Sequence, residues 1–113
     1  MDAEHARELL ARERARIEHA LAGLTRGSVE DVPDPSDASD AGEELFEQEL
    51  AEGETRALRE ELEAIARAER RLADGTYGIS VHSGEPIPDA RLEAVPWAER
   101  TAEEQAQLDA RGG

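Results

Sequence analysis

Four aspartates stand three residues apart in the segment SVEDVPDPSDASDAG, at Asp31, Asp34, Asp37 and Asp40. Carboxylates gathered on a turn could bind a divalent cation or pair with basic side chains of a partner. The segment lacks the D-x-D-x-D-G spacing and the final Glu of an EF-hand loop, which argues against a Ca²⁺ site of that kind. Taken alone, an aspartate-rich turn between helices is most often a solvated loop.

Other residues that could carry chemistry are scarce. The chain has no cysteine, which excludes disulfides and thiolate metal sites, and its three histidines, His5, His19 and His82, are widely scattered. No serine stands with a histidine in a recognisable motif, and no glycine-rich phosphate loop is present. We therefore expect no enzymatic activity, no cofactor and no bound metal.

The charge of the chain restricts its partners. Against 28 acidic residues there are 13 basic ones, for a formal net charge of -15. Binding to nucleic acid needs clustered Lys and Arg, so we expect no direct contact with DNA or RNA and a partner with a basic surface or a metal-bearing site. No apolar stretch or N-terminal leader suggests a membrane span or export, so we expect a cytoplasmic protein without membrane contact. The acidic surface also favours a monomer.

The composition predicts long helices. There is one each of Phe, Trp, Tyr and Met, which is too little large apolar surface for a sandwich or barrel. Apolar residues recur at helical spacing over residues 2–23 and 41–73, and Pro33 and Pro35 break the chain between them. Folding back at that turn makes residues whose numbers sum to about 70 face each other, as in Leu21 with Leu50. The prediction is an antiparallel coiled-coil hairpin over residues 1–73 with an acidic tip at 31–40.

A small second module is expected over residues 74–113. Gly75 is suited to end the long helix. The alternation of Tyr77, Ile79 and Val81 predicts one strand of a weak hairpin, and PDARLEAVP predicts a turn or short helix. A last helix is expected over residues 101–109, where Thr101 and Glu104 form a T-x-x-E capping box.

The segment DGTYGISVHSGEPIPDARLEAVPWAERTAEE resembles the zinc-finger part of the DksA/TraR family of RNA polymerase regulators. That pattern runs D-G-T-Y-G-x-C-x-x-C-G-x-x-I and then R-L-E-A-x-P-x-A-x-x-C-x-x-C. The positions in register are Asp74, Gly75, Thr76, Tyr77, Gly78, Gly84, Ile87, Arg91, Leu92, Glu93, Ala94, Pro96 and Ala98. Upstream, VPDPSDASDAGEELFEQEL resembles the family's hairpin tip and the start of its second arm. The resemblance implies a mainly α protein with a helical hairpin and a zinc-finger-like module.

The four cysteine positions of that pattern are occupied by Ser80, Ser83, Thr101 and Glu104. Three hydroxyls and one carboxylate form a hard, weak ligand set that would not hold Zn²⁺ as four thiolates do. We therefore predict a degenerate zinc finger without metal. The cap between Thr101 and Glu104 should replace part of the lost stabilisation, together with a small apolar core of Ile79, Val81, Ile87, Leu92, Val95 and Trp97.

At the tip, the resemblance points to an acidic D-x-x-D-x-A signature that acts near the polymerase active site. Asp34 and Asp37 match it, and Ser39 takes the alanine position. The resemblance thus implies a transcription regulator that enters the polymerase secondary channel, and it raises ppGpp as a modulator at a site shared with the polymerase. The alternative is a non-catalytic adaptor that keeps the scaffold but binds another protein through its arms.

Overall fold

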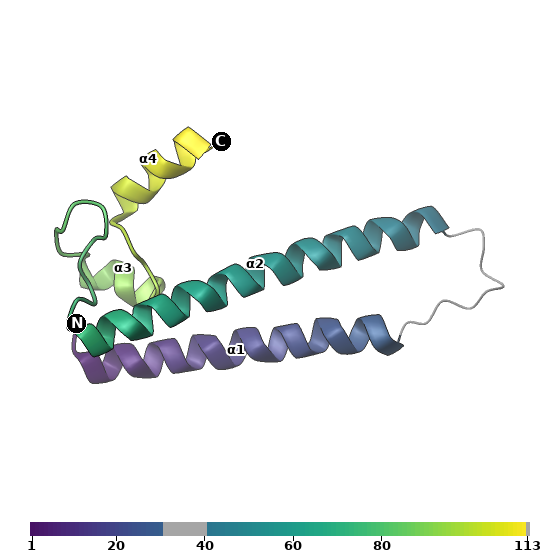
Figure 1. Ribbon diagram of the computed structural model, residues 1–113, viewed down its shortest axis with the longest axis horizontal. Coiled ribbons are helices and arrows are strands. Elements are labelled where there is room, and N and C mark those ends of the chain that lie inside the picture. The colour runs from purple at the N-terminus through teal and green to yellow at the C-terminus, as the bar shows by residue number, and fades with distance from the viewer. Residues whose placement is uncertain (31–40, 113) are drawn as a thin grey trace. The chain divides into compact units, whose positions relative to one another are not determined.

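The computed structural model describes residues 1–30 and 41–112, with side chains for 1–24 and 48–112. The described residues form four helices: α1 Ala3–Glu30, α2 Ala41–Asp74, α3 Asp89–Ala94 and α4 Ala102–Gly112 (Figure 1). The fold is mainly α, with two long arms and a short final helix, which confirms the expected fold class. The candidate tip residues Asp34, Asp37 and Ser39 lie outside the described residues.

The first arm reaches Glu30, the longer of the two ends that the sequence allows. The glycines at 23 and 27 favour an end near Gly23, yet the helix continues through them toward Asp31. Gly23 is exposed, and a helical backbone passes through a glycine at a cost of only about 1 kcal/mol relative to alanine. The second arm matches its expected range to within one residue. None of the described helices is long and apolar enough to cross a membrane.

The chain divides into two compact units, one of Met1–Arg14 with Glu63–Gly113 and one of Ala15–Leu62. The division crosses both long helices, so the base of each arm belongs to the same unit as the C-terminal module. The domain boundary expected after residue 73 marks the end of α2, and it stays a prediction about what folds independently.

A narrow apolar seam lies along the arms. In the first unit Ala6 and Leu10 of α1 and Ile65 and Ala68 of α2 are fully buried, and in the second unit Ile17 is fully buried. Their spacings of three, four and seven residues are those of one helix face. Two of these five residues are alanines, so the seam removes little apolar area from water.

Ion pairs between the arms show a different register from the expected one. Arg14 pairs with Glu69 in the first unit, and Arg16 lies 3.7 Å from Glu61 in the second. These residue numbers sum to 83 and 77, not to about 70. Leu50, expected opposite Leu21 in the seam, is 52% exposed. Both sums lie above the predicted value, so the predicted pairing of Leu21 with Leu50 was wrong, whereas Ala6 and Ile65, whose numbers sum to 71, are both fully buried.

The end of α2 is set by Gly75, whose φ of 79° is in the left-handed region. The Gly75 N–H donates to the carbonyl oxygen of Leu72, and the Thr76 N–H donates to that of Arg71 at 2.8 Å. This is the hydrogen-bond pattern of a Schellman motif, which satisfies carbonyls left free at a helix end. The chain thereby turns away from α2 into the C-terminal module.

The C-terminal module has a small core of Ile87, Leu92 and Ala98, with Met1, Tyr77 and Val95 packed against it. The predicted strand is reduced to one isolated antiparallel bridge between Ile79 and Pro86. Ile79 and Val81, expected in the core, are 41% and 50% exposed, whereas Ser80 between them is buried. Trp97, also expected in the core, is only partly buried.

Candidate functional site

The structure brings together the four residues at the cysteine positions of the family pattern. Ser80 and Ser83 lie in the loop after α2, Thr101 directly precedes α4, and Glu104 is in the first turn of α4. The Glu104 carboxylate is hydrogen-bonded to the other three. We call these four residues the clasp.

The α4 side of the clasp is a capping box. The Thr101 N–H donates to Glu104 Oε1 at 2.9 Å, and the Glu104 N–H donates to Thr101 Oγ1 at 3.2 Å. The Thr101 carbonyl accepts the first intrahelical bond, from Gln105 N–H at 2.9 Å. Each side chain thus satisfies a backbone donor that the helix start leaves free, as the T-x-x-E spacing predicted.

The loop side of the clasp centres on Ser80, which is only 3% exposed. Its hydroxyl donates to Glu104 Oε1 at 2.7 Å and accepts the N–H groups of His82 and Ser83 at 3.1 and 3.2 Å. The Ser83 side chain also hydrogen-bonds Glu104 and accepts the Glu85 N–H. The clasp therefore joins the loop after α2 to the start of α4. Its two central residues, Ser80 and Glu104, are 24 positions apart in the sequence.

These hydrogen bonds stabilise the ionised form of Glu104. The backbone N–H of Thr101, then the side chains of Ser83 and Ser80, lower the pKa of this carboxyl from 4.5 to about 2. Glu104 is therefore a carboxylate at neutral pH, and it acts as the acceptor at the centre of the clasp.

A second feature of the same unit is a hollow of about 380 Å³ lined by three arginines: Arg67 of α2, Arg91 of α3 and Arg100 before α4. We call it the arginine hollow; its remaining lining residues are Ala64, Val95, Trp97, Ala98, Glu99 and Gln105. The Arg67 Nε donates to Glu99 Oε1 at 2.7 Å. Arg91 Nε donates to the Arg100 carbonyl at 2.9 Å.

Arg71 adds positive charge next to this hollow. Its pKa is lowered by burial first and also by Arg67, while Glu99 opposes the shift, and its buried Nη2 has no hydrogen-bond partner. This arginine cluster is not predicted from the sequence. The signal for it was the spacing of Arg67 and Arg71 one helical turn apart, but Arg91 and Arg100 join them only in the fold.

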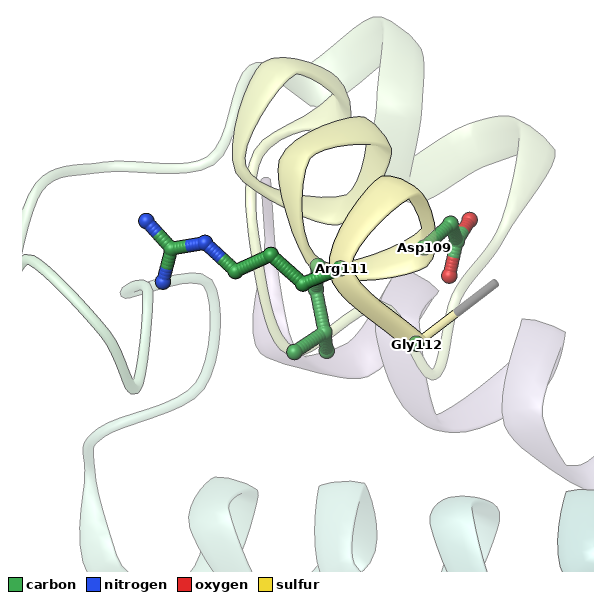
Figure 2. A pocket seen from close by; sticks show the side chains of 4 residues that line it. Asp109, Arg111 and Gly112 are labelled. Atoms are coloured by element: carbon green, nitrogen blue, oxygen red, sulfur yellow. The ribbon is translucent and has the colours of Figure 1, made fainter.

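Another hollow lies at the end of α4, where the residues of its last turns are the whole lining (Figure 2). Figure 2 shows Asp109 and Arg111 extending in different directions from the helix. No described residue of α4 is buried, and the side chain of Leu108 in this hollow is exposed. Opposite charges that diverge from one exposed helix end do not form a site.

The fold and part of the sequence are similar to those of known proteins. The chain superimposes on the structure of transcription factor DksA2 from Pseudomonas aeruginosa with a TM-score of 0.81 and 28% identity, over 97% of this chain and 84% of that one. The chain is DksA-like in fold and, over part of its length, in sequence. The RNA polymerase-binding transcription factor DksA of Caulobacter vibrioides is 47% identical over 47 residues, which are 42% of this chain and 33% of that protein.

A further relative of this DksA-like chain is general stress protein 16O of Bacillus subtilis, 49% identical over 51 residues, or 45% of this chain and 31% of that protein. The chain therefore spans about a third of the length of these two curated relatives. No protein-family model matches it.

The clasp does not fit the zinc ion that the family pattern implies. A hydroxyl has one hydrogen to donate and two lone pairs, and Ser80 uses all three in its bonds to Glu104, His82 and Ser83. Glu104 Oε1 already accepts two hydrogen bonds. Among the described residues, no three His, Cys, Asp or Glu side chains lie together as a metal site would require. The DksA-like fold thus has hydrogen bonds where the pattern has ligands.

Proposed function

We propose that this DksA-like protein is a transcription regulator that binds RNA polymerase rather than DNA. The observation that carries the proposal is the fold, which superimposes on a DksA2 transcription factor over nearly the whole chain. A second DksA, 47% identical over 47 residues of this chain, is named for binding RNA polymerase. The excess of 28 acidic over 13 basic residues supports binding to a protein and opposes binding to nucleic acid.

The proposed mechanism places the hairpin in the secondary channel of the polymerase, with Asp34, Asp37 and Ser39 near the active site. Carboxylates on a proline-stiffened turn are suited to pair with basic residues of the polymerase or to approach its Mg²⁺. A strongly acidic protein is also drawn toward a basic channel entrance, an attraction that salt weakens. ppGpp stays a predicted modulator of this complex.

The proposal predicts that the tip acts on transcription and not on folding. In a purified transcription assay, an Asp34→Asn, Asp37→Asn double variant should lose the regulatory effect while its affinity for core polymerase falls by no more than about threefold, since a single charge pair at a protein surface contributes little to binding. Ser39→Ala, which restores the family residue, is the matched control and should keep the effect. A folded double variant that regulates like the parent would refute the tip mechanism.

The same assay also separates the adaptor alternative. A parent chain that neither binds core polymerase nor alters transcription, while remaining folded, would leave the scaffold with another protein partner. Repeating the reaction with ppGpp tests the predicted modulation: an unchanged effect of the parent would remove ppGpp from the mechanism.

A further inference from the structure

The arginine hollow concentrates positive charge on an acidic molecule. Three of the 13 basic residues of the chain line it, and Glu99 is the single acidic residue of its lining. Arg71 lies close enough to Arg67 and Glu99 to feel the charge of both. Like charges gathered in this way repel one another, so an additional anion in the hollow would be attracted.

The guanidinium groups of the hollow have donors to spare. The hydrogen bond from Arg91 Nε to the Arg100 carbonyl orients the Arg91 guanidinium and leaves both of its Nη groups for another acceptor. Among residues 1–24 and 48–112, whose side chains the structure describes, the Arg100 guanidinium has no hydrogen-bond or ion-pair partner. Arg67, in contrast, is already paired with Glu99.

The pair of Arg67 and Glu99 shows which anion suits the hollow. In this pair the Glu99 carboxylate lies 2.7 Å from the guanidinium of an arginine in the same lining, and the Glu99 side chain is 18% exposed. Arginine forks match carboxylates well, because two parallel N–H groups can meet two oxygens. A second carboxylate at Arg91 and Arg100 would repeat this arrangement.

The remaining lining is apolar. Val95, Trp97, Ala98 and Ala64 supply aliphatic and aromatic surface beside the arginines. A ligand that only carried charge would leave this surface exposed to water, whereas a peptide with alternating acidic and apolar side chains would cover both parts. The volume accommodates a few side chains, and the acidic surface elsewhere would repel an extended polyanion.

We propose that the arginine hollow receives an acidic segment of the protein partner, whose carboxylates pair with Arg91 and Arg100 while an apolar side chain packs on Trp97. The identity of that partner as RNA polymerase rests on the proposed function. The hollow then anchors the base of the hairpin, and the acidic tip is left to act elsewhere on the enzyme.

Binding to purified core polymerase tests the anchor. An Arg91→Gln, Arg100→Gln double variant should bind about tenfold more weakly at low salt and show a shallower salt dependence, because two charge-assisted contacts are lost. Arg70→Gln, an equal charge change at an exposed position of α2, is the matched control and should stay within about twofold of the parent. Equal affinities for all three proteins would overturn the anchor while leaving the proposed function in place.

A peptide experiment tests the hollow without the polymerase. Trp97 is the only tryptophan of the chain and lines the hollow, so its fluorescence reports an occupant. A short glutamate–leucine peptide should shift the emission, and its glutamine–leucine counterpart should not. A response to inorganic tripolyphosphate alone, or to none of the three, would overturn the proposal even if the parent fails to bind polymerase. Should the double variant melt at a lower temperature than the parent, Arg100→Gln alone replaces it, since the Arg100 side chain has no partner among the side chains that the structure describes.

Discussion

Ser80 and Glu104 occupy positions that the family pattern gives to metal ligands. In this protein a hydrogen bond between them, instead of a shared metal ion, connects the loop after α2 to α4. A typical hydrogen bond adds only about 1 kcal/mol to stability, far less than a structural zinc ion contributes to a small finger. The clasp therefore holds the loop to α4 only in combination with the core of Ile87, Leu92 and Ala98. Its strongest member is charge-assisted, because Glu104 is ionised.

The clasp should make the module sensitive to acid. Because the folded pKa of Glu104 is about 2 and its ordinary value is 4.5, the carboxylate stabilises the fold fully above pH 4.5 and loses that contribution as the pH falls toward 2. Glu104→Gln should lower the melting temperature at pH 7, and the difference from the parent should shrink below pH 4.5. Thermal melts followed by circular dichroism between pH 7 and 2.5 measure it.

The matched control for this experiment is Glu103→Gln, an exposed neighbour in the same helical turn. The melting temperature of this control should differ little from that of the parent at every pH. A Glu104→Gln difference that stayed constant down to the lowest pH would show that the ionised carboxylate does not hold the clasp.

Residue spacing predicted one half of the clasp and not the other. The T-x-x-E box at Thr101 and Glu104 depends on local geometry alone, so the sequence was sufficient. Alternation told which residues near Ser80 share a face, but not which face is buried. Burying Ile79 and Val81 would have turned the Ser80 hydroxyl outward, away from Glu104 and from the two N–H groups that it accepts.

At the scale of elements, both arms were predicted but their register was not. Helical spacing and the proline-containing turn indicate two long helices whatever lies opposite them. An apolar seam that repeats every seven residues fits equally well after a shift of one heptad, so the pattern cannot distinguish neighbouring registers. Long-range ion pairs such as Arg16 with Glu61 decide between them, and a single sequence does not reveal those pairs.

The register predicts which apolar residues of α2 matter. Ile65→Ala should reduce the free energy of unfolding by about 3 kcal/mol, because its side chain is fully buried and an alanine would leave a cavity. Leu50→Ala removes a similar side chain that is 52% exposed and should cost less than about 1 kcal/mol. Urea denaturation of both variants measures the contrast. Equal losses would mean that Leu50 is in the seam after all and that the arms pack in the register expected from the sequence.

At the scale of the whole molecule, charge is divided between regions of opposite sign. The chain as a whole is strongly acidic, whereas Arg67, Arg91 and Arg100 gather around one hollow in the unit that contains the C-terminal module. The proposed functions of the acidic tip and of the hollow therefore differ in the sign of the partner surface. Raising the salt concentration should weaken polymerase binding by the tip and by the hollow. A variant whose charges are removed at one of these two places should keep the salt dependence that comes from the other.

The molecule should also fold without metal. Removing Zn²⁺ with EDTA should leave the melting temperature of the parent unchanged, because Ser80 has no free lone pair and the chain has no thiolate to offer. Thiol oxidants should be equally without effect, since there is no cysteine to react. The matched control is a variant with Ser80→Cys, Ser83→Cys, Thr101→Cys and Glu104→Cys, which restores the family ligands and should melt at a temperature that depends on zinc. Circular dichroism melts with and without EDTA, together with elemental analysis of the purified proteins, decide the matter. About one zinc per parent chain, or a parent destabilised by EDTA while the clasp residues are intact, would show that the clasp binds metal.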